Sequence, residues 1–277
     1  MSNFWSRTAT GLSMVFLIIV SLYISRWMFA AILLAVVVLG LAEFYNLVAS
    51  ESVKPQKILG IAAGAVWFSV STLIAILGSF ADLYYLSILP IPFLFLPFIR
   101  EIWTGNPSSL MNVALTILGL IYIVLPLSFL PFMNGPAEIR FLGMPAFLLG
   151  YLLITWVYDT GAYLFGVSFG KTKFFERISP KKTWEGTIAG AVSAALVAAG
   201  CSLLIPGIPI GDWMILLGIV LVFGTCGDLA ESLFKRSLNI KDSGTILPGH
   251  GGILDRFDTI FLSAPFVFLY FFIRNGI

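Results

Sequence analysis

Charged residues are scarce in this sequence. Asp, Glu, Lys and Arg make up 11% of its 277 residues, and there are two cysteines and one histidine. Cys201 and Cys226 both lie in apolar runs, which excludes a disulfide-rich scaffold and indicates buried small residues. A net charge of +2 gives no reason to expect a nucleic acid partner. We expect no cleavable signal, because the N-terminal apolar run has no convincing cleavage site and is interpreted as a first span. We also find no polar stretch long enough for a soluble domain, no internal repeat and no low-complexity tail.

Apolar residues, by contrast, make up 59% of the chain, and the mean hydropathy is +0.99. Several apolar runs approach the roughly twenty residues that cross a bilayer core of about 30 Å. We therefore predict an all-α, polytopic membrane protein with one membrane domain, 1–277. Within it, 1–140 form scaffold spans, and 141–277 carry catalytic spans and polar loops. We expect nine spans: 10–25, 27–48, 58–78, 83–99, 110–133, 141–166, 186–205, 211–236 and 256–274.

Two features predict interruptions in these spans. Only Ser25 and Arg26 separate the first two runs, which requires a tight turn. Proline cannot donate a backbone hydrogen bond, so it kinks or breaks a helix and frees carbonyl groups that neighbours must satisfy. Such prolines stand at positions 90, 92 and 97 of the fourth run and at 126 and 131 of the fifth.

The distribution of basic residues predicts the orientation. With nine spans and a cytoplasmic N-terminus, thirteen Lys and Arg side chains lie on the cytoplasmic side and three, Arg26, Arg140 and Arg274, lie outside. This positive-inside bias favours a C-terminus outside the cell. The two polar loops of the second half, at 170–186 and 235–256, then face the cytoplasm.

Within the first six predicted spans there are two carboxylates, and a charge inside a span is costly and indicates a functional or paired group. Glu43 is expected to contact a cation or polar group, or to be a boundary charge satisfied by Arg7 or Lys54. Asp159, flanked by Thr160, Gly161 and Tyr163, indicates an inward-facing polar pocket. Asp82 and Glu101 are interpreted as ordinary loop or interface charges.

The loop at 170–186 is basic and precedes a helix. Hydroxyls, ammonium groups and backbone N–H donors at a helix N-terminus suit a phosphate. The competing interpretation is a positive-inside loop that touches anionic lipid. The candidate phosphate-binding residues here are Lys171, Lys173, Ser179, Lys181, Lys182 and Thr183.

The richest stretch is 224–258. Asp228, Glu231, Ser232 and Lys235 share one face of a predicted helix, and Asp255, Arg256 and Asp258 open the next. Carboxylates and cations together are typical of a site where a hard divalent cation and phosphates meet. The alternative is that these charges only pair with one another. That alternative gives no reason for the glycine-rich sequence between them. The sole histidine, His250, lies in that sequence, and its role is left open between a phosphate ligand, a group that orients a carboxylate and a structural residue.

From Ser232 to Asp258 the chain resembles the phosphatidate cytidylyltransferase (CDP-diacylglycerol synthase) family of bacterial type. Its signature has the form S-x-x-K-R-x4-K-D-x-[GSA]-x2-[LIF]-x-x-H-G-G-x-x-D-R-x-D. The matching residues are Ser232, Lys235, Arg236, Lys241, Asp242, Gly244, Leu247, His250, Gly251, Gly252, Asp255, Arg256 and Asp258. The block SPKKTWEG at 179–186 also resembles a conserved block of that family.

The resemblance implies transfer of a cytidylyl group from CTP to phosphatidic acid in the bacterial inner membrane, giving CDP-diacylglycerol and pyrophosphate, with Mg²⁺ required. In-line attack of an already anionic lipid phosphate on the α-phosphorus needs positioning and charge neutralisation rather than a protein nucleophile. As metal ligands we expect Asp228 and Asp255, then Glu231 and Asp258. Lys235 and Arg256 are expected to act in catalysis. We expect the substrate phosphates to be bound by the candidate residues of the 170–186 loop and by Arg236, Lys241, His250, Gly251 and Gly252.

Two other functions also fit. A membrane phosphotransferase acting on another lipid or polyprenyl phosphate could use the same charges with a different donor. An ion-coupled transporter would suit the broken helices and the carboxylates in spans, but transporters commonly place such groups between repeated halves. Here the charges collect at one face and no repeat is found. A homo-oligomer is left open.

Overall fold

The computed structural model describes residues 2–77, 90–134, 139–240, 243–244 and 251–275, with side chains from residue 11 onward. The chain forms two compact units. The first comprises Met1–Pro136 and Asp242–Phe257, and the second Ala137–Lys241 and Asp258–Ile277. The stretch that carries the signature is therefore shared between the units.

Within the described residues, seven helices are long and apolar enough to span a membrane, so this is a multi-pass membrane protein. The predicted helical class is confirmed, whereas the count of nine spans is not. The run 10–25 forms a shorter apolar helix over Gly11–Ile24, and the run 83–99 lies partly on 78–89, outside the described residues. The seven are Arg26–Val48, Lys57–Leu77, Ser109–Asn134, Ala146–Phe169, Trp184–Leu204, Ile210–Ser237 and Leu254–Asn275.

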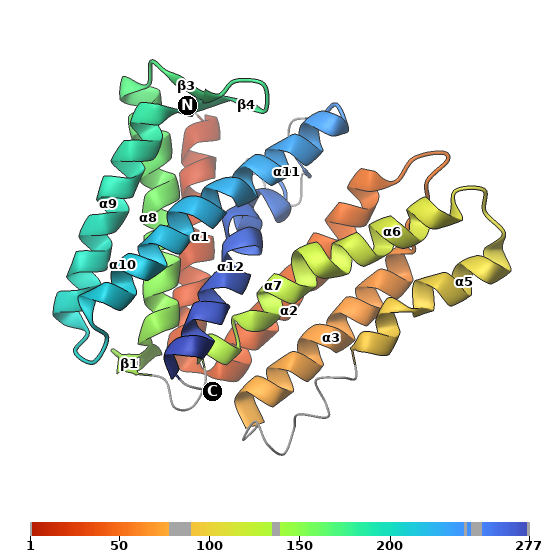
Figure 1. Cartoon of the computed structure of the whole chain (residues 1–277), viewed down its shortest axis with the longest axis horizontal. Helices are drawn as coiled ribbons and strands as arrows, with labels where there is room; N and C mark the ends of the chain where they lie inside the picture. Colours follow the sequence, from red (N-terminus) through yellow and green to blue (C-terminus); the bar gives the residue numbers. More distant parts are fainter. Residues whose placement is uncertain (1, 78–89, 135–138, 241–242, 245–250, 276–277) are drawn as a thin grey trace. The chain divides into compact units, whose positions relative to one another are not determined.

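The first unit is built on helices that pack side by side, with α3 against α2 and α7 (Figure 1). Tyr45 fills its centre, where its hydroxyl donates to the Thr116 carbonyl at 2.8 Å. Gly60 and Gly119 lie against the Tyr45 ring, and a Cβ at either would overlap it. The elements are α1 (Ser2–Ile24), α2 (Arg26–Val48), α3 (Lys57–Leu77), η2 (Ile91–Leu94), α5 (Leu96–Thr104), α6 (Ser109–Gly119), η3 (Leu120–Val124), α7 (Leu125–Phe129) and η4 (Phe132–Asn134).

The predicted interruptions are confirmed in this unit. α1 ends at Ile24, and Ser25 caps α2 by accepting a hydrogen bond from the Met28 N–H at 3.0 Å. The π-helical turn η3 directly precedes Pro126, which has no N–H to continue an α-helical ladder. In the fourth run, Pro92 lies in the 3₁₀ helix η2 and Pro97 in the first turn of α5.

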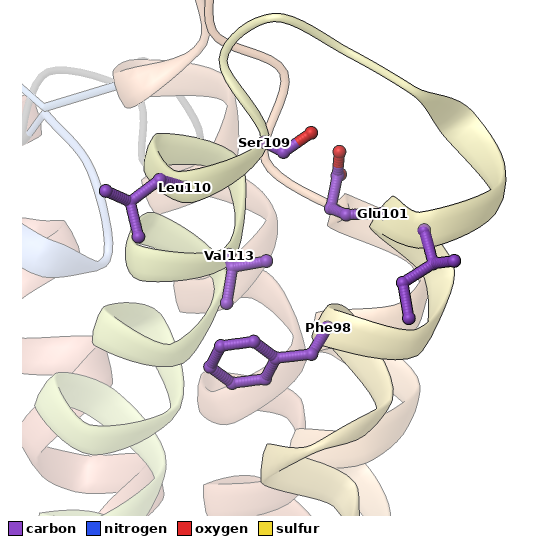
Figure 2. A pocket seen from close by; sticks show the side chains of 6 residues that line it. Phe98, Glu101, Ser109, Leu110 and Val113 are labelled. Carbon is purple, nitrogen blue, oxygen red and sulfur yellow. The ribbon is translucent and has the colours of Figure 1, made fainter.

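Glu101 on α5 is not the ordinary loop or interface charge that the sequence indicated. It is buried and accepts hydrogen bonds from Gln56 Nε2 at 2.9 Å and Thr104 Oγ1 at 3.0 Å. It also lines a pocket of about 360 Å³ between α5 and α6. Figure 2 shows the polar ends of Glu101 and Ser109 on one side of this pocket and the Phe98 ring on the other. α5 exposes the apolar side chains of Phe98, Ile99, Ile102 and Trp103 together with the charged Arg100.

In the second unit, α8, α9 and α10 pack against one another (Figure 1). Two antiparallel hairpins, β1–β2 and β3–β4, are the strands found in the described residues, and the all-α prediction did not include them. The elements are β1 (Arg140–Phe141), β2 (Met144–Pro145), α8 (Ala146–Phe169), β3 (Lys173–Phe175), β4 (Ser179–Thr183), α9 (Trp184–Leu204), α10 (Ile210–Ile219), η5 (Val220–Gly224), α11 (Thr225–Ser237) and most of α12 (Leu254–Asn275).

Glycines bring α8 and α9 into close contact. A Cβ at Gly190 would lie 2.8 Å from the backbone nitrogen of Ala162 and from the Tyr158 carbonyl oxygen. Gly186 stands one turn earlier on α9 and meets the Ala162 carbonyl in the same way. Small residues four apart are a common device for close helix approach in membranes. This packing fixes the hairpin β3–β4, which connects the two helices.

Candidate active site

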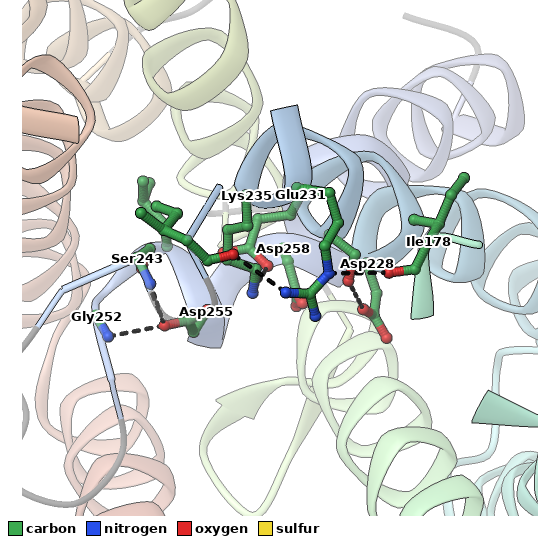
Figure 3. Close-up of polar contacts among 12 residues, drawn as sticks. Ile178, Asp228, Glu231, Lys235, Ser243, Gly252, Asp255 and Asp258 are labelled. Atoms are coloured by element: carbon green, nitrogen blue, oxygen red, sulfur yellow. Dashed lines mark hydrogen bonds and ion pairs between the residues drawn. The ribbon is translucent and has the colours of Figure 1, made fainter. Parts of the chain in front are cut away.

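In the second unit, α11 presents two carboxylates that are both paired with lysines. Asp228 accepts from Lys182 Nζ at 2.5 Å, and Glu231 from Lys235 Nζ at 2.5 Å. Glu231 is the more buried, with 4% of its side chain exposed, against 29% for Asp228. Ser232 Oγ lies 3.4 Å from the second oxygen of Asp228. Figure 3 shows Asp228, Glu231 and Lys235 on this helix, so the predicted helix face is formed. Lys182 from β4 joins it through Asp228.

Asp258 on α12 completes this group of acids. It is half-buried, and Asp228, Glu231 and Asp159 lie close enough for their charges to repel its own. Its Oδ1 accepts from the Thr259 N–H at 2.6 Å. Asp159 accepts from Thr259 Oγ1 at 3.1 Å but is exposed, which differs from the enclosed pocket that the sequence indicated. Several negative charges at close range form a region that favours cations.

The hairpin β3–β4 positions Lys182 opposite α11. Lys173 pairs with Thr183 across the hairpin, and Thr183 Oγ1 caps α9 by accepting the Gly186 N–H at 3.2 Å. Burial alone would lower the pKa of Lys182, but the negative charge of Asp228 outweighs burial and raises that pKa. Lys182 is therefore a firmly charged ammonium group.

A carboxylate that sequence reasoning missed orders the turn before the hairpin. Glu185 accepts the backbone N–H of Lys171 at 3.2 Å and of Thr172 at 3.0 Å. Lys171 was predicted to bind a phosphate, and here its backbone N–H donates to a protein carboxylate. The signal was an acid in the first turn of a helix, where the helix dipole favours it.

The other predicted phosphate ligands of this unit differ in exposure. Ser179 is half-buried, and Arg236 also reaches back to the hairpin, where its Nε lies 3.4 Å from the Ile178 carbonyl. Four of these predicted ligands are exposed cations: Lys171, Lys173, Lys181 and Arg236.

In the first unit, Asp255 accepts backbone hydrogen bonds at the start of α12. Figure 3 shows its Oδ2 facing Gly252 and Ser243, whose N–H groups donate to it at 2.9 and 3.1 Å. The Ser243 hydroxyl lies 3.0 Å from the same oxygen. Gly251 has φ +80°, and a Cβ there would also collide with Asp255. Arg256 is exposed, and Lys241 and His250 lie outside the described residues.

Glu43 on α2 is a second residue whose role the sequence left open. It is buried and accepts the backbone N–H of Ile253 at 2.8 Å and of Leu254 at 3.3 Å, together with the Ser243 hydroxyl. The polar contact that was one of its two interpretations is therefore present. The sequence signal for such a role was that Glu43 is the sole acid in an apolar run.

The acids of the second unit suit a magnesium ion by their chemistry. Mg²⁺ takes oxygen ligands and is commonly held by one or two carboxylates with substrate phosphates and water. Asp228 and Asp258 supply such oxygens, and the mutual repulsion of the acids around Asp258 favours a cation. Among the described residues, no three His, Cys, Asp or Glu side chains are grouped as a ready-made metal site.

Comparison with known proteins places these residues in a family. The family model described as the cytidylyltransferase family matches residues 5–274. A phosphatidate cytidylyltransferase of Rickettsia typhi is 41% identical over 174 residues, which cover 60% of this chain and 73% of the relative. One of Staphylococcus saprophyticus is 36% identical over 193 residues, 66% of this chain and 68% of the relative. One of Staphylococcus aureus is 41% identical over 170 residues, 58% of this chain and 59% of the relative.

Proposed function

This chain belongs to the cytidylyltransferase family, and we propose that it transfers a cytidylyl group from CTP to phosphatidic acid, giving CDP-diacylglycerol and pyrophosphate. The family match over residues 5–274 carries this proposal. The site agrees with it, because acids, lysines and a capped helix start are the groups that bind phosphates and the cations that accompany them. The multi-pass fold gives a lipid substrate access to the protein from the bilayer.

We propose that Lys182 and Lys235 act on the phosphates. Each is an ammonium group held at 2.5 Å from a carboxylate of α11, so its position is fixed before the substrate arrives. A fixed charge stabilises a phosphoryl transition state without reorganisation. The exposed Lys171, Lys173 and Lys181 on or beside the hairpin are assigned to the first electrostatic attraction of the anionic substrates.

The reaction needs no protein nucleophile. An oxygen of the phosphatidate phosphate forms a bond to the α-phosphorus of CTP, and the bond from that phosphorus to the β-phosphate oxygen breaks. The electron pair leaves with pyrophosphate. Because the attacking oxygen is already anionic, no base has to remove a proton, and the protein acts by positioning and charge neutralisation.

Magnesium dependence is part of the proposal. Asp228 and Asp258 are the residues of the second unit that would hold the ion, and Glu231, paired with Lys235, would support them. When bound, Mg²⁺ supplies neutralisation of the triphosphate charge and polarisation of its oxygens. We also place both polar loops on the cytoplasmic side, because the excess of Lys and Arg in them follows the positive-inside rule.

A substrate matrix tests this function. Purified protein in detergent is given phosphatidic acid or a polyprenyl phosphate with labelled CTP, ATP, GTP or UTP, with Mg²⁺ or with EDTA. The proposal predicts labelled CDP-diacylglycerol with CTP and Mg²⁺ and its loss in EDTA. Product with another nucleotide, or with a polyprenyl phosphate but not phosphatidic acid, would favour the different membrane phosphotransferase. No product from protein with a cooperative thermal transition would contradict the assignment.

A further inference from the structure

Glu43 is a carboxylate that no part of the proposed reaction uses. It lies in the membrane-spanning helix α2 and is 4% exposed. A charged side chain in a span is costly unless other groups compensate it. All of its hydrogen-bond donors in the described residues belong to the two segments on either side of 245–250: Ser243, Ile253 and Leu254.

The contacts of Glu43 are those of a helix cap supplied from another helix. The first N–H groups of a helix have no partner within it and carry the positive end of the dipole. Glu43 Oε2 takes the Ile253 N–H at 2.8 Å, and Oε1 takes the Leu254 N–H at 3.3 Å, at the point where α12 begins. A carboxylate at this position both satisfies these donors and complements the dipole.

Glu43 also explains two glycines of the signature. A Cβ at Gly252 would collide with the Glu43 carboxylate and the Ser243 hydroxyl, and a Cβ at Gly244 would lie 2.9 Å from Glu43 Cδ. The carboxylate therefore fills the space that side chains at these positions would need. This close fit makes Glu43 part of the same packed unit as the start of α12.

The other interpretation of Glu43 was a boundary charge satisfied by Arg7 or Lys54. The side chain of Arg7 lies outside the described residues, and a pairing with Lys54 does not match the contacts. Lys54 is exposed, and its backbone N–H donates to Asn112 Oδ1 at 2.7 Å. Within the part of the chain that the structure describes, Glu43 meets amide and hydroxyl donors rather than an ammonium or guanidinium group.

We propose that Glu43 is a positioning residue for the reaction: it fixes where α12 begins and thereby the place of Asp255 and Arg256 in its first turn. Asp255 contributes to the same arrangement, since Ser243 contacts both carboxylates. The inference rests on the proposed function, and it assigns a role to an α2 residue 210 positions away from Ile253.

The test combines kinetics with hydrogen exchange. Glu43→Gln keeps the shape of the side chain but removes the charge and places an amide N–H₂ where an acceptor is needed. Ser243→Ala removes one contact and leaves α2 unchanged. Tyr45→Phe is the matched control, because Tyr45 is also buried on α2 and loses one hydrogen bond, but to α6. All four proteins are assayed for cytidylyl transfer and for amide exchange of a peptide covering 251–258.

We expect Glu43→Gln to lower kcat about 10- to 100-fold while the KM for CTP and for phosphatidic acid stays within about threefold. Amides at 253 and 254 should exchange about tenfold faster. Ser243→Ala should show a smaller loss of kcat of the same kind, and Tyr45→Phe should match the wild type in both measurements.

Two results would overturn the inference. The first is that the wild type is active and Glu43→Gln has the same kcat and the same amide exchange as Tyr45→Phe. The other is faster exchange throughout α2 and α3 with a parallel loss of thermal stability, which would indicate a merely structural role. A wild type that makes no product would instead contradict the proposed function, and unchanged exchange at 253 and 254 would still count against the Glu43 contact.

Discussion

At the scale of single residues, the site consists of charges that are paired before any substrate binds. Lys182 and Lys235 each hold a carboxylate of α11, and Asp258 adds a third acid nearby. Paired charges of this kind stay ionised despite partial burial. Removing one partner therefore alters the charge balance of the site without removing much packing volume.

Asp228→Asn tests this arrangement. We expect turnover to fall about 100-fold or more, because a proposed metal ligand is lost and Lys182 loses its partner. The melting temperature should change little, because Asn has nearly the same volume as Asp and the Asp228 side chain is 29% exposed. Glu176→Gln, an exposed acid in the β3–β4 hairpin, removes the same charge and should keep full activity. Near-normal turnover in Asp228→Asn would remove Asp228 from the site.

The candidate site was predicted from the sequence to the extent that its residues are close together in the chain. Asp228, Glu231 and Lys235 were placed on one face because a helix repeats every 3.6 residues. The pairing of Asp228 with Lys182 required two segments to meet, which spacing alone does not disclose. The role of Glu43 was left undecided for the same reason, because its hydrogen-bond partner Ile253 is 210 positions away in the chain.

At the scale of elements, close packing of α8 and α9 supports the hairpin that carries Lys182. Gly190 allows this approach because its missing Cβ would meet the backbone of α8 at 2.8 Å. A methyl group there must push the two helices apart. The hairpin between them would move with α9.

Gly190→Ala should lower stability by about 1–3 kcal/mol through overpacking. Gly200→Ala is the matched control on the same helix, where a Cβ meets nothing within 4 Å. It should be neutral or stabilising by up to about 1 kcal/mol, because alanine favours a helix more than glycine does. Thermal unfolding in one detergent compares the two variants. Equal melting temperatures would contradict the packing described here.

Glu101 connects α5 to the segment before α3 and to α6. Burial acts to raise the pKa of Glu101, but hydrogen bonds from Gln56, Thr104, Ser109 and Asn112 outweigh it and lower that pKa below the ordinary 4.5. A lowered pKa in the folded state contributes stability above about pH 4.5, and this contribution is lost as the pH falls through the folded value.

Glu101→Gln should therefore melt a few degrees below the wild type at pH 7, and the gap should close on acidification below pH 4.5. Glu51→Gln, an exposed acid in a loop, should show no such gap. Melting temperatures from pH 7 to pH 3 give the comparison. A gap that widens in acid would contradict the role of the ionised carboxylate.

At the scale of the whole molecule, hydropathy and proline predicted the multi-pass helical class and the breaks at Ser25 and Pro126. They did not predict the hairpins, since short strands in a polar loop have no clear period. Nor did they predict that Asp242–Phe257 belong with the first unit. That grouping depends on contacts such as Glu43 with Ile253, which composition does not contain.

The central claim is that the lipid phosphate attacks the α-phosphorus of CTP. The most direct measurement uses phosphatidic acid whose phosphate carries ¹⁸O, with unlabelled CTP and Mg²⁺, and mass spectrometry of both products. The account predicts CDP-diacylglycerol that retains all of the label and pyrophosphate with none, because only the bond from the α-phosphorus to the β-phosphate oxygen of CTP breaks. Label in the pyrophosphate, or no nucleotide-bearing lipid from folded protein, would contradict it.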